Sequence, residues 1–318
     1  MRRNKFVLVT GDDFIWNRDD LVQFLIANQG NPILIDTREE GMCLSSVGVY
    51  QLLEYFKFSD VIVRTNNPLE AHSLFQIEIE TPHKFFILEH HNYSQYYHWN
   101  KNQVFGCLYN RPIWHRIGLA AEMQSKHNEI SLINIRSDPN DINQRELFEI
   151  QKLFVNSPQS FKLFAQIKHT WPRQIELIDS YTVGNTTNGH TDQLAVFYPE
   201  FLVDIVAETF TTGTCFFPTE KTVRPMLLKK PMIVMGSQDS LEYLRQMGFK
   251  TFNDFWDEEY DGFAQENRYH KILELIDQIA QHPIDALVDM YKRMQPILDH
   301  NYNLLISQSY KKTITKIS

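Results

Sequence analysis

Short hydrophobic runs alternate with amphipathic stretches along the first hundred residues. The amphipathic stretches cover residues 20–27 and 49–58, where apolar positions recur with a helical period. The runs between them are continuously apolar, as in strands that are buried on both faces. Because strands and helices alternate, we expect the strands to pair in parallel. The predicted strands are residues 6–9, 32–35, 61–63 and 85–88.

A polar and aromatic stretch at residues 90–103 interrupts this pattern, which then restarts. We therefore predict an α/β chain of two Rossmann-like domains, residues 1–100 and 101–285, followed by a C-terminal helical segment, 286–318. In the second part the predicted strands are 104–108, 130–135, 201–206 and 231–235. The predicted helices are 113–123, 142–154, 240–247, 269–280 and 283–306, with another that begins near Thr219.

Charge limits the ligands that this chain can bind. The sequence has 31 lysines and arginines against 39 aspartates and glutamates, a formal net charge of −8 with histidine neutral. Proteins that bind along nucleic acid usually carry a basic surplus or a basic stripe, so we exclude polymeric nucleic acid as a partner. A few phosphates on a small molecule stay compatible, because two or three cations and a helix N-terminus suffice to bind them.

The cysteines and the lack of a long apolar run bear on location. Cys43, Cys107 and Cys215 match neither a CxxC pair nor a disulfide framework. No stretch reaches the ~18 uninterrupted apolar residues of a membrane span, and the first residues do not read as a secretory signal. We expect a cytoplasmic protein without a membrane span, and we leave peripheral membrane association open.

Common nucleotide-binding motifs are missing from the sequence. The turn at Gly11 lacks the glycines of GxGxxG, and GxxxxGK[ST] does not occur, which argues against dehydrogenases and P-loop enzymes. The acidic pairs 12–13 and 19–20 match no recognised pattern of metal ligands. We therefore expect neither a metal nor a bound cofactor.

Residues 219–224 combine features of a nucleotide site. Thr219 is a good N-cap, which would leave the next amides at the positive end of a helix. Lys221 and Arg224 add two cations within one turn, and Glu220 offers a carboxylate for both hydroxyls of a cis-diol. Together they fit a nucleoside diphosphate. An exposed Glu220–Arg224 helix pair explains the same spacing equally well.

The string FFPTEKTVR at residues 216–224 resembles the donor-site signature of the α-1,3-fucosyltransferase family. The chain is also similar to phage-type and bacterial glycosyltransferase-like proteins at residues 230–234, 248–252 and 256–261. The resemblance implies a GT-B arrangement, in which two Rossmann-like domains face each other across a cleft and the second holds a nucleotide-sugar donor. It also implies an inverting transfer that needs no metal.

The string LYNRPIWHR at residues 108–116 is similar to a strand-to-helix turn that faces the donor pyrophosphate in this family. The resemblance implies that Arg116, and less directly Arg111, bind the diphosphate beside Asn110. It also implies Glu208 as a donor contact, since the related enzymes carry a glutamate upstream of Thr-Glu-Lys. The alternative at residues 110–116 is ordinary helix-start chemistry without a function.

An inverting transfer needs a base that takes the proton of the acceptor hydroxyl. Glu89 follows the strand predicted at 85–88, where fucosyltransferases carry such a glutamate, so the resemblance implies Glu89 as the base. Asp13 is the reserve candidate. A glutamate that opens a polar loop, with His90 and His91 behind it, equally needs no function.

We therefore expect a glycosyltransferase that moves a sugar from a nucleotide-diphosphate sugar to a hydroxyl of a glycan or another acceptor. The alternatives are a non-catalytic GT-B-like protein that binds a glycan or a partner, and another nucleotide-sugar enzyme such as an epimerase. The acidic residues 257–259 predict a solvated surface. Four aromatic residues fit either stacking on an acceptor sugar or packing at a domain interface: Tyr93, Tyr96, Tyr97 and Trp99.

Overall fold

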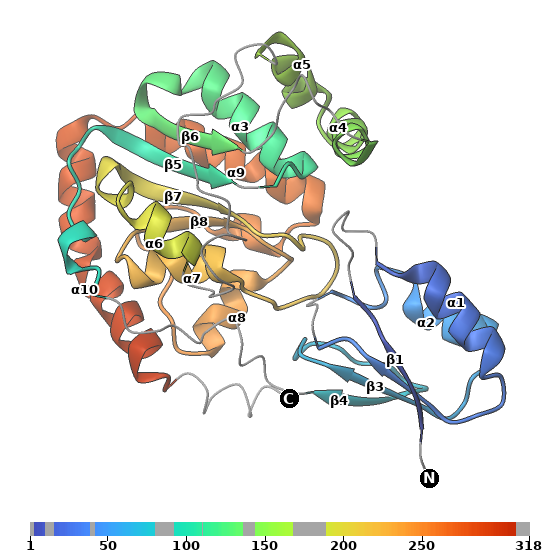
Figure 1. Ribbon diagram of the computed structural model, residues 1–318. Coiled ribbons are helices and arrows are strands. Elements are labelled where there is room, and N and C mark those ends of the chain that lie inside the picture. The colour runs from blue at the N-terminus through green and yellow to red at the C-terminus, as the bar shows by residue number, and fades with distance from the viewer. Residues whose placement is uncertain are drawn as a thin grey trace.

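In the structure, a computed structural model, the described residues form two parallel β-sheets of four strands each (Figure 1). Every strand pair in these sheets is parallel. The α/β class and the parallel pairing expected from the alternation of strands and helices are therefore confirmed. The structure describes residues 3–9, 16–38, 42–79, 92–109, 111–135, 144–167 and 189–309.

The first sheet follows the order of the chain. Its strands are β1 (Asn4–Val7), β2 (Ile33–Asp36), β3 (Val61–Thr65) and β4 (Gln76–Ile79). Its helices, α1 (Arg18–Ala27) and α2 (Val49–Tyr55), lie on the same face of the sheet (Figure 1), as successive right-handed crossovers require. Apolar side chains of both helices form one core with the inward side chains of β2 and β3.

In the second sheet the strands do not follow the order of the chain. Its strands are β5 (Gln103–Tyr109), β6 (Ser131–Ile135), β7 (Phe201–Ala207) and β8 (Met232–Met235). Their spatial order is β6-β5-β7-β8, so the chain leaves β5 to one side and later returns to its other side. The position between β5 and β7 is a topological switch point, where open α/β sheets bind ligands outside the carboxyl ends of the strands.

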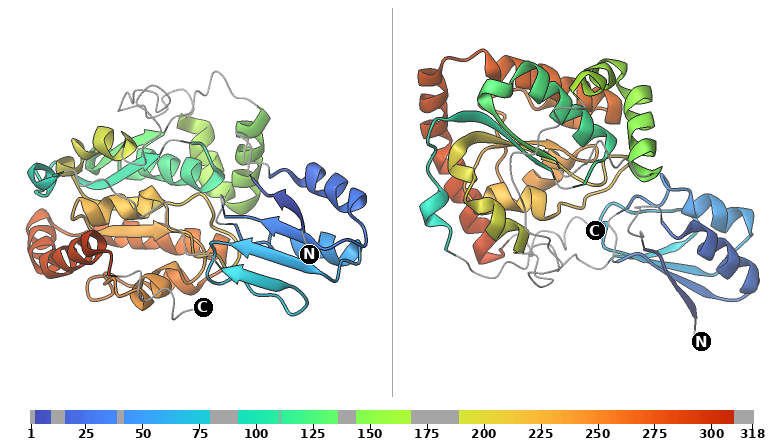
Figure 2. Two further views of the ribbon diagram at one scale, coloured as in Figure 1. Left: turned by 60° about the horizontal axis from the view of Figure 1, so that its bottom comes forward. Right: turned by 45° about the horizontal axis from the view of Figure 1, so that its top comes forward.

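Helices cover both faces of this second sheet (Figure 2). The helices of this part of the chain are α3 (Trp114–Lys126), α4 (Gln144–Asn156), α5 (Pro158–Ile167), α6 (Gly189–Ala195), α7 (Glu220–Leu227), α8 (Ser240–Gln246), α9 (Gln265–Ala280) and α10 (Ile284–Ser307), of which α4 and α5 pack on α3. The two crossovers leave β5 and β7 in opposite directions, which puts α3 and α7 on opposite faces. Here α3 packs on α9, and α10 packs on α7.

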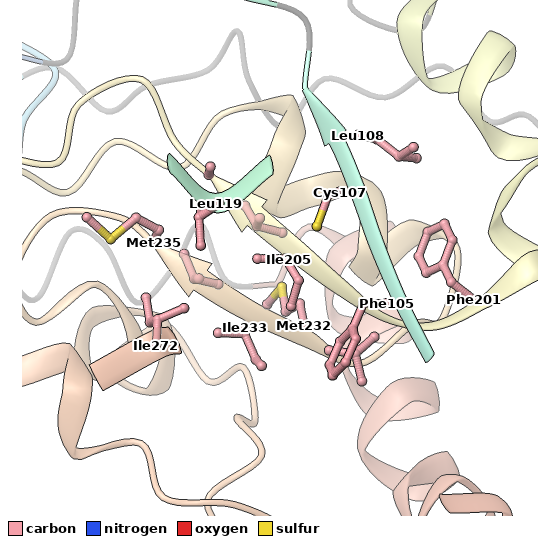
Figure 3. Close-up of a cluster of buried hydrophobic side chains, with 14 of the residues drawn as sticks. Phe105, Cys107, Leu108, Leu119, Phe201, Ile205, Met232, Ile233, Met235 and Ile272 are labelled. Carbon is pink, nitrogen blue, oxygen red and sulfur yellow. The ribbon is translucent and has the colours of Figure 1, made fainter. Parts of the chain in front are cut away.

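The core of the second domain lies between the strands β5, β7 and β8 and the helices that cover them, among them α3 with Leu119 and α9 with Ile272 (Figure 3). Phe105, Phe201 and Ile233 are fully buried there. Helix α10 contributes Met294 and Leu298 to the same core. The C-terminal helix expected after residue 285 is thus part of the second domain's packing.

The loop that follows β7 in the second domain makes non-covalent contacts with the first domain. The side-chain amide of Asn67 donates from Nδ2 to the Thr214 carbonyl at 3.1 Å and accepts from the Phe216 amide at 3.1 Å. Cys43 of the first domain packs with Cys215 and Phe217 in a small apolar cluster. The Asn67 side chain therefore satisfies one backbone carbonyl and one backbone amide of the loop, as the backbone of a neighbouring strand would.

Most predicted elements are present with bounds shifted by a few residues. The sequence pattern missed β4, α5 and α6, and the strand predicted at 85–88 lies outside the described residues. The expected solvated surface at 257–259 is wrong for Glu258, which is 8% exposed and accepts the Phe252 amide at 2.8 Å. Within the described ranges, no helix is both long and apolar enough to cross a membrane.

The aromatic residues before β5 pack against the second domain. The ring of Tyr97 contacts Tyr302, and that of Trp99 contacts Tyr291, both on α10. Tyr93 donates to Asp192 at 2.5 Å. These contacts show packing against elements of the second domain, and stacking on an acceptor sugar stays a prediction.

Gly106 in β5 tests how closely the core is packed. A Cβ at this position would lie 2.6 Å from two ring atoms of Phe201. We expect Gly106→Ala to lower the free energy of unfolding by about 1–3 kcal/mol, because a rigid aromatic ring must shift. The measurement is the midpoint of urea denaturation at unchanged slope. Gly262→Ala is the control, since its Cβ would meet no atom closer than 3.9 Å; equal losses in both variants would contradict the packing argument.

Candidate functional site

Three segments that are distant in sequence meet at the carboxyl ends of β5 and β7. They are the turn after β5, the residues after β7 and the first turn of α7. The residues singled out from the sequence that these segments bring together are Arg111, Arg116, Glu208, Thr219, Glu220 and Lys221. The candidate site therefore lies at the switch point of the second sheet.

Glu208 caps the start of α7 from the end of β7. Its carboxylate accepts from the Thr219 amide at 2.9 Å, from the Thr219 hydroxyl at 2.6 Å and from the Thr222 hydroxyl at 2.6 Å. Glu208 is 4% exposed. A buried carboxylate with three donors at the positive end of a helix is well compensated. Glu208 thus fills the anion position at this helix end with the chain's own charge.

Thr219 is the N-cap of α7, as the sequence predicted. Its hydroxyl accepts from the Lys221 amide at 3.3 Å and from Lys221 Nζ at 3.1 Å. The helix continues through Pro225 to Leu227. The alternative that the sequence left open, an exposed pair of Glu220 and Arg224, is not what the structure shows, because Arg224 is 5% exposed.

Glu220 and Lys221 form the accessible pair of the site. Lys221 Nζ lies 2.7 Å from Glu220 Oε1, and the two side chains are 21% and 32% exposed, Lys221 being the less accessible. Burial by itself raises the pKa of Glu220, but the cations Lys221 and Arg224 outweigh it and lower that pKa to about 2. The carboxylate is therefore ionised at neutral pH, beside a cation that still reaches the surface.

Arg116 is a buried link between the turn after β5 and the end of β7. Its Nε donates to the Ala207 carbonyl at 3.0 Å, and its terminal nitrogens donate to the Arg111 carbonyl and the Thr209 hydroxyl, both at 3.3 Å. Burial lowers its pKa to about 10, although Glu208 and Glu220 raise it in part. Arg116 therefore stays charged at neutral pH, and its hydrogen bonds hold the turn after β5 against the end of β7. Arg111, in contrast, is exposed at the surface.

Arg224, on the buried face of α7, belongs to a polar cluster between this helix and β7. It hydrogen-bonds Tyr198, whose hydroxyl donates to Asp204 on β7. Burial raises the pKa of Asp204 to about 6, and burial lowers the pKa of the nearby Lys230 to about 7. Burial also lowers the pKa of Arg224, but the neighbouring Tyr198, Glu220 and Asp204 more than offset this. The guanidinium of Arg224 is therefore charged but almost closed off from the surface, since Arg224 is 5% exposed.

A cavity of about 320 Å³ opens beside these residues. Its walls come from the start of α3, from α4, from residues 209–212 after β7 and from the start of α9. Glu149 of α4 accepts the Trp114 amide at 2.9 Å and pairs with Lys152 Nζ at 2.8 Å. The first amide of α3 could in principle donate a hydrogen bond to a phosphate, but it already donates to the carboxylate of Glu149.

His115 connects the cavity to Glu208. The ring is fully buried, and its Nε2 lies 2.9 Å from the Glu208 carbonyl oxygen, which can only accept. Burial, reinforced by the adjacent Arg116, lowers the pKa of His115 to about 3. The imidazole is therefore neutral at physiological pH, with its proton on Nε2.

Three candidates lie outside the described residues: Asp13, Glu89 and Asn110. Sequence reasoning missed His115, Glu149 and Lys152. His115 lies inside the motif at 108–116, but only the structure shows that its ring bonds the backbone of Glu208. Glu149 and Lys152 look like an ordinary helix pair, and no local signal shows that they face the start of α3.

Glu208 should be required for the stability of the second domain. Glu208→Ala leaves buried donors of Thr219 and Thr222 without an acceptor, so we expect a loss of about 2–3 kcal/mol in the free energy of unfolding. Urea denaturation measures this loss. Glu266→Ala, at an exposed position in α9, is the control. A Glu208→Ala protein as stable as the control would show that α7 does not depend on this cap.

The pKa of Glu220 predicts a pH dependence. The folded value of about 2 lies below the ordinary value of 4.5, so ionised Glu220 stabilises the fold above pH 4.5. This contribution is lost as the pH falls through 4.5 towards 2. In NMR titrations of the carboxyl group, Lys221→Met should raise the pKa of Glu220, and Lys271→Met, at a distant ion pair, should not. An unchanged pKa in Lys221→Met would refute the dominance of this cation.

No protein-family model matches this chain, and neither a curated protein nor a solved structure matches it. No relative therefore assigns a function to it. The side chains gathered at the switch point remain the basis on which its function can be inferred.

Proposed function

We propose that this protein is a GT-B-type glycosyltransferase that binds a nucleotide-diphosphate sugar at the carboxyl ends of β5 and β7. The observation that carries the proposal is the convergence of Arg116, Glu208 and the Glu220–Lys221 pair at the switch point. Ligands of open α/β sheets bind at such points. The similarity of residues 216–224 to the fucosyltransferase donor signature agrees with this location.

The exposure of each charged group suggests which part of the nucleotide-sugar donor it would contact. Lys221, like the exposed Arg111, is a cation that can meet the diphosphate directly. Glu220 beside Lys221 is ionised and able to accept hydroxyls of the ribose. The guanidinium groups of Arg116 and Arg224 are buried close by and add positive potential to the same place. In a transfer without a metal, these cations would stabilise the charge of the leaving diphosphate.

The transfer step needs a base as well as a donor site. Glu89, with Asp13 in reserve, stays a prediction from the sequence, because both lie outside the described residues. In the proposal the first domain presents the acceptor, a glycan or another hydroxyl compound, across a cleft from the donor. We place the protein in the cytoplasm, since its three cysteines are all buried as thiols.

A non-catalytic binding protein is the second candidate. The observation that favours it is that Glu208 and Glu149 already occupy the helix ends where phosphate would bind. The two candidates differ in chemistry. A transferase should hydrolyse its nucleotide sugar slowly without an acceptor, whereas a binding protein should leave the donor intact through prolonged incubation.

Lys221 offers the direct test of the donor site. We expect Lys221→Ala to weaken the binding of nucleoside diphosphates by roughly 10- to 100-fold, because a charge-assisted contact to phosphate is lost. Isothermal calorimetry with GDP, UDP, ADP and CDP measures the affinity.

Lys229→Ala is a matched control for this variant. Lys229 is 19% exposed and pairs with Asp299 at 2.7 Å, much as Lys221 pairs with Glu220, but it belongs to the opposite end of α7. Affinity should be unchanged in this variant. If Lys221→Ala binds as tightly as the control, the donor site lies elsewhere.

A further inference from the structure

We propose that helix α4 docks on an anionic lipid bilayer and inserts its outer apolar side chains between the headgroups. The inference goes beyond the proposed function, because α4 carries none of the candidate donor-binding residues. The exposure, the spacing and the charge of the side chains on α4 and α5, at the rim of the second domain (Figure 1), carry it.

The outer face of α4 is apolar and open to solvent. Its spacing of i, i+1, i+7 and i+8 is that of one side of a helix, around Gln151. Such a stripe normally faces the core, but α4 packs on α3 through its other side, where the buried Leu153 lies against Gly118. The stripe consists of four side chains that are 50% to 74% exposed: Leu147, Phe148, Phe154 and Val155.

The charged side chains described on α4 and α5 are divided by sign between the inside and the surface. Glu146 and Glu149 are each 8% exposed. Lys152 pairs with Glu149 but still reaches the surface, and Lys162 is exposed on α5. A chain with a net charge of −8 therefore buries its carboxylates at this place and exposes its lysines. This distribution is complementary to a negatively charged surface.

An apolar stripe flanked by lysines is typical of helices that lie in the membrane interface. The apolar side chains enter the boundary between headgroups and acyl chains, while the ammonium groups stay among the phosphates. Lys152 and Phe148 already have this arrangement, with Nζ 4.4 Å from the centre of the ring. The two parts of an interfacial helix are thus present side by side on α4.

A protein partner fits the same face less well. The four apolar side chains present an area on the order of 500 Å², whereas a stable protein interface covers about 800 Å² on each partner. Interfaces between proteins are also depleted in lysine and contain about one hydrogen bond per 100–200 Å². Within the stripe, Gln151 is the side chain that could form one. A lipid surface needs no such matched hydrogen bonds, so the observations favour it.

Docking through α4 would bring the cavity of the second domain close to the bilayer. Glu149, Lys152 and Asn156 line this cavity of about 320 Å³. Their spacing of i, i+3 and i+7 places them on a different side of α4 from the stripe. The cavity would therefore lie about one helix diameter, roughly 10–12 Å, from the lipid headgroups.

Sedimentation with vesicles tests the inference without any nucleotide. The full chain is mixed with vesicles of phosphatidylcholine, or with vesicles in which about one quarter of the lipid is phosphatidylglycerol. We expect binding to the anionic vesicles to be at least about fivefold tighter and to weaken as salt is added, because the lysines act electrostatically.

Phe154→Ser combined with Val155→Ser removes apolar surface at positions that are already exposed. This α4 double variant should bind the anionic vesicles roughly tenfold more weakly or worse, because less apolar surface leaves water. Ile26→Ser combined with Leu74→Ser is the matched control, since these side chains are 53% and 65% exposed in the first domain. Its binding should be unchanged. The midpoint of urea denaturation shows whether both proteins are folded.

Lys162→Gln tests the charge separately from the apolar contact. It should weaken binding to the anionic vesicles about fivefold and leave binding to phosphatidylcholine unchanged. Lys292→Gln, at an exposed position on α10, is the control and should bind both kinds of vesicle like the wild type.

Four outcomes would overturn the inference. They are no binding to either kind of vesicle, equal affinity for both kinds, and wild-type affinity in the α4 double variant or in Lys162→Gln. It also fails if analytical ultracentrifugation finds a dimer that the α4 double variant abolishes, because a second copy then covers the stripe. None of these results bears on the donor site, which the calorimetry of Lys221→Ala tests without lipid.

Discussion

The carboxyl edge of the second sheet depends on one buried residue, Glu208. Its amide donates to the Met235 carbonyl at 2.9 Å and its carbonyl accepts from His115, so its backbone joins β8 and α3 to the end of β7. Its carboxylate holds Thr219 and Thr222 at the start of α7. A carboxylate in this position cannot stay unpaired, because the loss of its hydration must be offset by donors within the protein. Two strands and two helices are therefore held at fixed positions around Glu208. The Glu220–Lys221 pair lies in the first turn of one of these helices, α7, so its position is fixed as well.

Positive charge reaches this edge although the chain as a whole is acidic. Arg116 is 1% exposed and donates to two carbonyl oxygens, and Arg224 is buried on α7 beside Tyr198 and Asp204. Burying such groups is costly unless each is hydrogen-bonded or paired, which these contacts provide. Charges beneath a surface are screened less by salt than charges on it. The net charge of −8 thus says little about the local potential, which a few buried cations and one half-buried lysine determine.

The loop after β7 links the cavity to the contact between the domains. Thr209 and Thr211 line the cavity, while the amide of Asn67 in the first domain holds Thr214 and Phe216 a few residues further on. Arg268 reinforces the loop by donating to the Thr211 carbonyl at 3.3 Å. Only a few residues of this loop therefore separate the lining of the cavity from the contact with the first domain.

The sequence by itself determined the α/β class, the strands of both sheets except β4, and the N-cap at Thr219, because hydrophobic period and capping chemistry are local. It also pointed to residues 108–116 and 216–224, although it could not tell a ligand-binding arginine from a structural one. Only the tertiary structure decided that Arg116 and Arg224 are buried, that Glu149 caps α3 and that His115 reaches Glu208. It also added β4, α5 and α6, whose patterns are weak on their own. Each of these features depends on partners far away in the chain, and the return of the chain from β6 to β7 beside β5 is what brings them together.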